Sequence, residues 1–182
     1  MTGVRIVLFR GMNTGGVRAS VAAQKAMALD LGLDNPRTLL ASGNLVVNSD
    51  RAPAELEDRI EAATECRFGR RIETLVRTGE QWSALMAANP FVEQSRIDPS
   101  RVVMMVMKAG VKPGGLEALT TLAADGEKVL ETADTLWFWH PDGIGRSRMA
   151  AKAQPRLIGT GTGRNWSTVV KIAASAGIGE DR

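Results

Sequence analysis

Glycine, asparagine and arginine residues gather in short polar segments at three separated places in the chain. The segments are residues 10–16 (RGMNTGG), residues 42–44 (SGN), and residues 143–147 (GIGRS) with residues 164–166 (RNW) shortly after. Each segment stands where a β-pattern meets a turn or the start of a helix. Backbone bends of this kind point N–H groups outward, and arginine and asparagine add side-chain donors. We therefore predict a polar site for an anion or a carbonyl-rich ligand. The sequence does not indicate which reaction, if any, takes place there.

The candidate ligand-binding residues all come from these segments. They are Arg10, Asn13, Gly15, Gly16, Ser42, Gly43, Asn44, Arg146, Ser147, Arg164 and Asn165. Each type of residue also has a structural interpretation. The glycines can serve a tight approach to the first helix, Arg10 can pair with a carboxylate, and the asparagines and Ser147 can cap their own turns or helices. Both interpretations stay open at this point.

Several other chemistries have little support in the sequence. Ser42 lacks the G-x-S-x-G pattern of a nucleophile elbow. His140 is the single histidine and Cys66 the single cysteine, so no usual zinc site is expected, and no acidic cluster points to magnesium. We interpret His140 as a structural residue at a strand end and Cys66 as an inert thiol. No metal is predicted, any cofactor is unknown, and whether the protein is an enzyme stays open.

The first half of the chain predicts an alternation of strands and helices that would position the polar segments. The expected order is β-α-β-β-α-β, with strands at 4–9, 38–41, 45–47 and 72–77, and helices at 20–31 and 53–69. This order is that of a ferredoxin-like lobe. In that topology the loop after the first strand and the hairpin turn at 42–44 share one sheet edge. Residues 10–16 and 42–44 would then be neighbours.

The second half predicts a similar but incomplete lobe. A short helix with a capping box formed by Thr78 and Gln81 comes first, and residues 91–100 are typical of a linker. The predicted elements that follow are a strand at 102–107, a helix at 116–122, a hairpin at 128–140, and helices at 145–157 and 166–176. No counterpart of the first lobe's last strand is expected. We predict an α+β protein with lobes at 1–90 and 101–182.

Composition and charge limit the possible partners. The chain has 182 residues, 44% of them hydrophobic and 24% charged, and no apolar run is long enough to cross a membrane. One cysteine and the absence of a signal-peptide pattern favour the cytoplasm. Residues 145–182 hold seven basic and two acidic residues, whereas the remainder holds sixteen and eighteen. This basic C-terminal end is either a solvated face or a surface that attracts phosphate or nucleic acid.

Five blocks in sequence carry a family resemblance. From about residue 4 to about residue 176, the chain resembles the domain-of-unknown-function 1697 family. The blocks that match its consecutive motifs are LFRGMNTGG, TLLASGNLVV, Asn89-Pro90-Phe91, GIGRSRM and TGRNWSTV. This family is a set of small bacterial proteins with no assigned biochemical role. The resemblance implies a two-lobed α+β fold in the cytoplasm and supplies no catalytic residues.

Three classes of function remain. The preferred hypothesis is a ligand-binding protein or an enzyme that acts on a small phosphorylated or carboxylated molecule through Arg10, Asn13, Asn44 and Arg164. The second is a structural or assembly protein whose polar loops serve packing alone. The third is a nucleic-acid-binding module, favoured by a pI of about 9.4 and opposed by an aromatic content of 4%. The oligomeric state is unknown.

Overall fold

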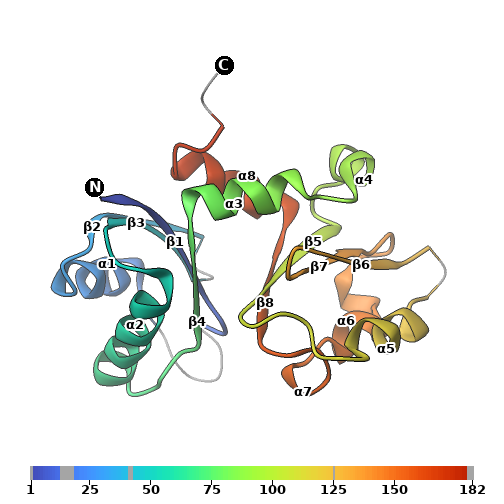
Figure 1. Cartoon of the computed structure of the whole chain (residues 1–182), viewed down its shortest axis with the longest axis horizontal. Coiled ribbons are helices and arrows are strands. Elements are labelled where there is room, and N and C mark those ends of the chain that lie inside the picture. Colours follow the sequence, from blue (N-terminus) through green and yellow to red (C-terminus); the bar gives the residue numbers. More distant parts are fainter. Residues whose placement is uncertain (1, 13–18, 41–42, 125, 180–182) are drawn as a thin grey trace. The chain divides into compact units, whose positions relative to one another are not determined.

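The chain forms two compact units, each with its own four-stranded antiparallel sheet. The computed structural model describes residues 2–12, 19–40, 43–124 and 126–179. The first unit comprises Met1–Ala84 with Lys171–Arg182, and the second comprises Leu85–Val170. In the described residues, eight α-helices accompany the two sheets (Figure 1). The predicted mixed α+β fold is confirmed.

The first unit has strand order β2-β3-β1-β4, with each pair of neighbours antiparallel. Helices α1 and α2 pack on one face of this sheet (Figure 1). The elements, in chain order, are β1 (Gly3–Phe9), α1 (Val21–Asp30), β2 (Asp34–Leu39), β3 (Asn44–Ser49), α2 (Pro53–Phe68) and β4 (Thr74–Thr78). Helix α3 (Gly79–Ala87) follows, and α8 (Trp166–Ser175) is the last helix.

Local sequence signals explain where these elements begin and end. The Ser20 hydroxyl accepts the Ala23 N–H at 3.1 Å and starts α1, as predicted. Pro53 occupies the first turn of α2, and Gly69 ends that helix in a left-handed conformation. The predicted capping box is also confirmed. Gln81 N–H donates to the Thr78 hydroxyl at 3.1 Å while Thr78 N–H donates to the Gln81 side chain at 2.9 Å.

Two buried glutamates on α2 bind the outer edge of β4. Glu57 Oε1 accepts the Val76 N–H at 2.8 Å, and Glu61 Oε1 accepts the Thr74 N–H at 3.0 Å. Four residues along a helix rise about 6 Å, and two residues along a strand span about 6.7 Å. The two carboxylates therefore match alternate N–H groups of the strand.

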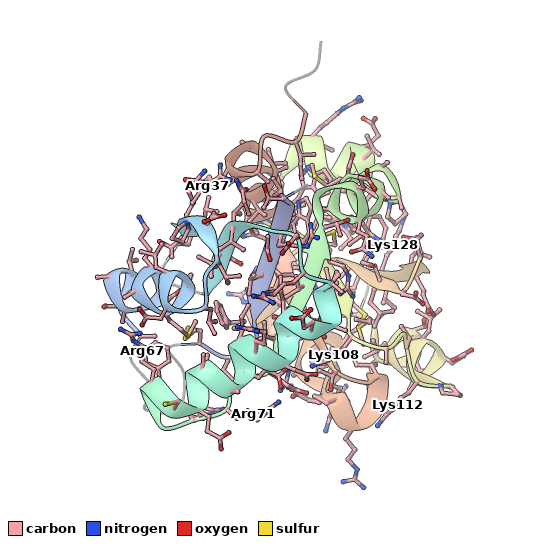
Figure 2. All side chains as sticks on the ribbon, turned by 60° about the vertical axis from the view of Figure 1, so that its left-hand side comes forward. Arg37, Arg67, Arg71, Lys108, Lys112 and Lys128 are labelled. Atoms are coloured by element: carbon pink, nitrogen blue, oxygen red, sulfur yellow. The ribbon has the colours of Figure 1, made fainter. Side chains whose placement is uncertain are left out.

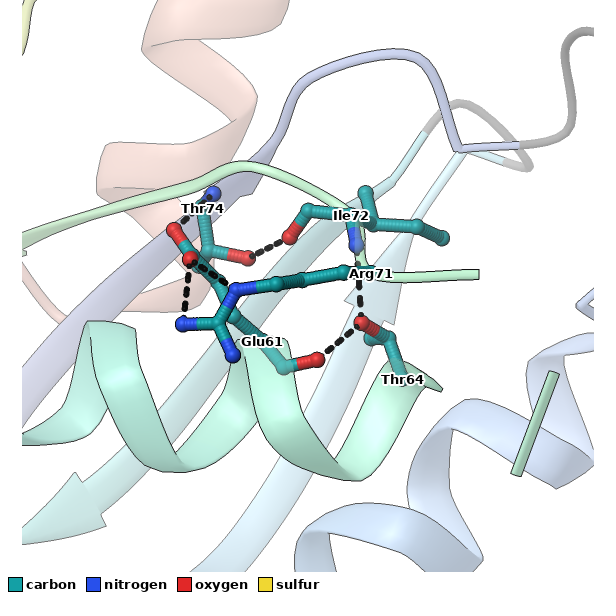
Figure 3. Close-up of polar contacts among 5 residues, drawn as sticks. All are labelled: Glu61, Thr64, Arg71, Ile72 and Thr74. Carbon is teal, nitrogen blue, oxygen red and sulfur yellow. Dashed lines mark hydrogen bonds and ion pairs between the residues drawn. The ribbon is translucent and has the colours of Figure 1, made fainter. Parts of the chain in front are cut away.

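The same contact continues toward the start of the strand, as Figure 3 shows. The Thr64 hydroxyl accepts the Ile72 N–H at 3.0 Å and donates to the Glu61 carbonyl at 2.7 Å. Arg71 donates to Glu61 Oε2 at 3.1 Å, which supplies a positive partner to a carboxylate that is otherwise buried. An edge strand with its N–H groups accepted in this way offers no template for pairing with another chain.

The turn before β3 depends on a glycine. Gly43 has φ of +83°, and its carbonyl accepts the Phe9 N–H at 2.9 Å. A Cβ at this position would lie 2.7 Å from Met12 Cβ and 3.0 Å from Phe9 Cβ. Both the backbone conformation and the close packing therefore require glycine here.

The second unit has strand order β6-β7-β5-β8. Its elements are α4 (Val92–Ile97), β5 (Val102–Met107), α5 (Gly115–Leu122), β6 (Lys128–Thr132), β7 (Thr135–Trp139), η1 (Ile144–Arg146), α6 (Arg148–Lys152), α7 (Pro155–Ile158) and β8 (Gly161–Asn165). Its helix-facing core includes Met107, Leu119, Leu136, Phe138 and Met149. Helix α4 lies within residues 91–100, which the sequence had indicated as a linker.

The prediction of an incomplete second lobe is wrong, because β8 pairs with β5 and provides a fourth strand. Its sequence, GTGRN, lacks the apolar alternation that identifies a strand. A Cβ on Gly161 would lie 2.6 Å from Met107 Sδ, so the close pairing requires a residue that is rare in strands.

Membrane insertion through a helix has no support in the described part of the chain, where every helix is too short or too polar to span a bilayer.

We predict that Glu61→Ala lowers the free energy of unfolding by about 1–3 kcal/mol, because it leaves the buried Thr74 N–H without an acceptor. Glu61→Gln keeps an acceptor and should lose less. Glu65→Ala, an exposed position on the same helix, should stay within about 0.5 kcal/mol of the wild type. Urea unfolding measures all three, and equal losses at Glu61 and Glu65 would contradict the role of Glu61.

We also predict that Gly43→Ala is more destabilising than Gly32→Ala. Gly32 has a similar φ of +71° but nothing within 4 Å of an added Cβ, so its variant carries only the left-handed backbone strain of about 1–2 kcal/mol. Gly43→Ala adds the clash with Met12, of about 1–3 kcal/mol. Thermal unfolding of the two variants compares these values, and equal destabilisation would show that the turn relaxes.

Candidate functional site

The structure brings two of the predicted polar segments together in the first unit. Leu8 in β1 pairs with Asn44 in β3, so the loop after β1 and the turn before β3 meet at one end of the sheet. The Phe9–Gly43 backbone hydrogen bond closes this end. Asn13, Gly15, Gly16 and Ser42 lie outside the described residues.

The side chains at this edge have partners within the protein. Arg10 Nη1 lies 3.1 Å from Glu73 Oε2, and the Arg10 backbone N–H donates to the Glu73 carbonyl at 2.8 Å. Asn44 is buried, and its amide donates to the Leu39 carbonyl at 3.0 Å. Both contacts agree with the structural interpretations, an ion pair for Arg10 and a turn cap for Asn44.

The predicted residues of the second unit do not form one cluster. Ser147 starts α6, and its hydroxyl accepts the Ala150 N–H at 2.9 Å, while Arg146 is exposed in η1. Arg164 in β8 pairs with Met104 of β5, whose side chain lies on the sheet face opposite the helix-facing core. Helix α6 covers the other face, so the sheet separates Arg164 from Ser147.

Arg164 and Asn165 have local roles. Arg164 Nη1 donates to the Thr162 hydroxyl and to the Gly163 carbonyl, both at 2.8 Å. Burial lowers the pKa of the Arg164 guanidinium to about 10, so it remains charged at neutral pH. Asn165 Oδ1 accepts the Thr168 N–H at 3.0 Å, which confirms the predicted cap of α8.

A pocket with the chemistry of an anion site lies elsewhere in the second unit. We call it the lysine pocket, and it is lined by residues 108–113 of the loop after β5 and by Gly159 and Thr160 before β8. The pocket has a volume of about 380 Å³ and is open to solvent on one side. Lys108 and Lys112 are its charged lining residues (both labelled in Figure 2), and no carboxylate lines it among the described residues.

Backbone contacts hold the two loops of the lysine pocket together. Lys108 N–H donates to the Thr160 carbonyl at 2.8 Å, and Lys112 N–H donates to the Ile158 carbonyl at 3.1 Å. A Cβ on Gly159, where φ is +90°, would approach the Gly110 carbonyl to 3.2 Å. Glycine therefore permits the close approach of the loops that form the pocket.

The loop between the lysines can contribute further donors. Within the described part of the chain, the N–H groups of residues 109, 110 and 111 donate no backbone hydrogen bond. Successive N–H groups in a bent loop can bind the oxygens of a phosphate or carboxylate, and ammonium groups add charge. The arrangement can therefore bind an anion without a metal.

Sequence reasoning missed this pocket, although a signal for it was present. The segment KAGVKPGG directly follows the apolar strand 102–107 and combines two lysines with three glycines and a proline. It matches no phosphate-binding pattern such as GxGxxG or GxxxxGK[ST]. The segment forms a pocket only together with the second loop, at residues 159–160, which lies about fifty residues later in the chain.

Comparisons with known proteins identify the family from the sequence and a similar fold among solved structures. A family model described as "Protein of unknown function (DUF1697)" matches residues 2–137. No curated protein matches the chain. The solved structure of a conserved bacterial protein, SP0830 from Streptococcus pneumoniae, is similar in fold, with a TM-score of 0.75 and 21% identity over 97% of this chain and 99% of that one. Since the family match spans well over half of its residues, the chain belongs to the DUF1697 family.

Proposed function

We propose that the protein binds a small phosphorylated or carboxylated molecule in the lysine pocket. The observation that carries this proposal is a pocket whose charged lining residues, among those described, are two lysines. Its volume of about 380 Å³ lies toward the lower end of the usual range for small-molecule sites, about 300–1,000 Å³. We also propose that the first unit is a ferredoxin-like lobe, which its element and strand orders support, and that the protein acts in the cytoplasm.

The edge formed by Arg10, Gly43 and Asn44 supports ligand binding less well. Arg10 has a carboxylate partner and Asn44 caps its own hairpin. An anion at Arg10 would have to compete with Glu73 for the guanidinium. We therefore keep the predicted class of ligand and propose a different place for it.

A thermal-shift panel tests the proposal. The probes are inorganic phosphate, pyrophosphate, a nucleoside monophosphate, a sugar phosphate and a dicarboxylate. A ligand at 100 times its Kd adds about 2.7 kcal/mol to the free energy of unfolding, which for a chain of this size raises the Tm by roughly 5–10 °C. We expect at least one probe to produce such a shift.

Paired variants locate the binding. Lys108→Met with Lys112→Met should abolish the shift, because it removes both charges and keeps side-chain length. Lys128→Met provides the matched control, since Lys128 is an exposed lysine of the same unit that does not line the pocket (Figure 2). Loss of the shift in both variants would indicate a general effect of charge. A shift that survives the double variant would place the ligand elsewhere.

A substitution at Asp134 tests the same proposal through an expected gain in binding rather than a loss. Its Oδ1 would lie 3.4 Å from a Cβ on Gly110, so a negative charge stands beside the loop that lines the pocket. Asp134→Asn should strengthen binding of the same probe, because it removes repulsion of an anion. Unchanged or weaker binding, measured by calorimetry, would argue against an anion at Gly110.

Nucleic acid is the competing ligand class that the panel must separate. Binding of a short oligonucleotide should weaken steeply with salt, because each phosphate contact releases counterions. Steep salt dependence with no response to any small probe would overturn the proposal in favour of a nucleic-acid-binding module.

A further inference from the structure

Four exposed basic side chains follow one another in the second unit between β7 and β8. They are Arg146, Arg148, Lys152 and Arg156. Residues 143–179 include no acidic residue at all. We call residues 144–158, which comprise η1, α6 and α7, the basic segment.

The charges of the basic segment are not neutralised by the protein itself. Within the described part of the chain, none of its four basic side chains takes part in a hydrogen bond or an ion pair. The first unit differs in this respect, since six of its arginines lie within 4.0 Å of a carboxylate oxygen: Arg10, Arg51, Arg59, Arg67, Arg71 and Arg77. A surface of one sign without counter-charges attracts partners of the opposite sign.

The basic segment is anchored on the core of the second unit, so its charges stand on a fixed backbone. Met149 in α6 and Ile158 in α7 are both buried in that core. Arg148 and Lys152 are four residues apart in α6 and therefore lie on one side of this helix. Binding through such positions requires the ordering of side chains only, and no loop has to be ordered.

The elements beside the basic segment add one more cation and one anion. Lys112 Nζ donates to the Arg156 carbonyl at 3.5 Å, which brings its ammonium group to α7. Helix α5 packs against both α6 and α7 and carries one acidic residue, Glu117. Positive charge therefore predominates over the basic segment and its neighbours.

The other properties of this surface favour a phosphate backbone over a membrane or an acidic peptide. A membrane-binding surface needs an exposed apolar face, whereas the described residues 144–158 expose one large apolar side chain, Ile144. Double-stranded nucleic acid presents one negative charge per about 1.7 Å of its axis. An extended peptide advances about 3.3 Å per residue, so even a fully acidic peptide offers a less dense row of charges.

We propose that the basic segment binds the sugar–phosphate backbone of double-stranded nucleic acid without reading its sequence. Guanidinium groups, which three of the four side chains carry, bind phosphate oxygens in pairs. Residues 108–113 and 143–160 contain no aromatic residue, so unpaired bases have no side chain to stack on there. This inference does not rest on the proposed function, because the lysine pocket and the basic segment can each bind without the other.

Fluorescence anisotropy of a labelled DNA duplex of about 20 base pairs tests this inference. Four phosphate contacts predict a slope of log K against log [salt] of about −3.6, so binding should weaken about 150-fold between 50 mM and 200 mM salt. A duplex of a different sequence should bind with the same Kd within about twofold. A single strand of the same length should bind no more tightly than the duplex, because the surface offers no stacking.

Two double variants of equal charge locate the contact. Arg148→Gln with Arg156→Gln should reduce the salt slope by about 1.8 and weaken binding about tenfold or more at 50 mM salt. Lys25→Met with Lys128→Met removes the same charge at exposed positions in α1 and β6, and should leave the slope and the Kd unchanged. Thermal unfolding verifies that both variants fold. The arginine variant should also keep any thermal shift that a small probe produces in the lysine pocket, which separates the two proposals.

Each outcome supports or overturns the inference. A steep salt slope that the arginine variant reduces and the lysine variant retains supports it. Equal losses in the two variants, a preference for one duplex sequence, or no binding at 50 mM salt overturns it. Poly-glutamate binding as tightly as the duplex would indicate an acidic protein instead, and equally tight binding to phosphatidylserine vesicles would indicate a membrane surface.

Discussion

The outer edge of β4 is the place where the first unit is held together by side chains rather than by another strand. Its outward N–H groups, at Ile72, Thr74, Val76 and Thr78, are accepted in turn by Thr64, Glu61, Glu57 and Gln81. Three of these acceptors come from α2, so the same contacts fix the helix on the sheet. The fourth belongs to the capping box that starts α3. One row of hydrogen bonds thus closes the sheet edge, positions α2 and sets the start of the next helix.

This row also shows what sequence patterns can and cannot predict. The stripe of Leu56 and Ile60 identified α2, and both residues are buried as expected. Glu57 and Glu61 follow those residues directly and look like ordinary surface glutamates. Their burial depends on the N–H groups of a strand in a later segment, so no local pattern reveals it. The same limit applies to β8, where the backbone of β5 supplies the pairing and glycine supplies the fit.

Polar residues at bends were the strongest signal in the sequence, and the described asparagines and serine among them have local partners. Asn44, Ser147 and Asn165 each bond to the backbone within five residues. Short polar side chains favour such local bonds because little conformational entropy is lost in forming them. A bend rich in asparagine and serine therefore predicts a cap more strongly than a ligand site. Lysines in a glycine loop add positive charge as well as donors, and Lys112 Nζ also donates to the Arg156 carbonyl at 3.5 Å.

Strand β5 leads directly into the lysine pocket. The loop that follows Met107 lines the lysine pocket. As an inner strand, paired with β7 and β8 along its length, β5 is among the positions least able to shift. The family match spans residues 2–137 and so includes residues 108–113 but not Gly159 or Thr160, which line the same pocket. One loop of the lysine pocket therefore lies inside the matched region and the other lies beyond it. Backbone hydrogen bonds from Lys108 and Lys112 to the Thr160 and Ile158 carbonyls join the two loops, so the shape of the pocket depends on both of them.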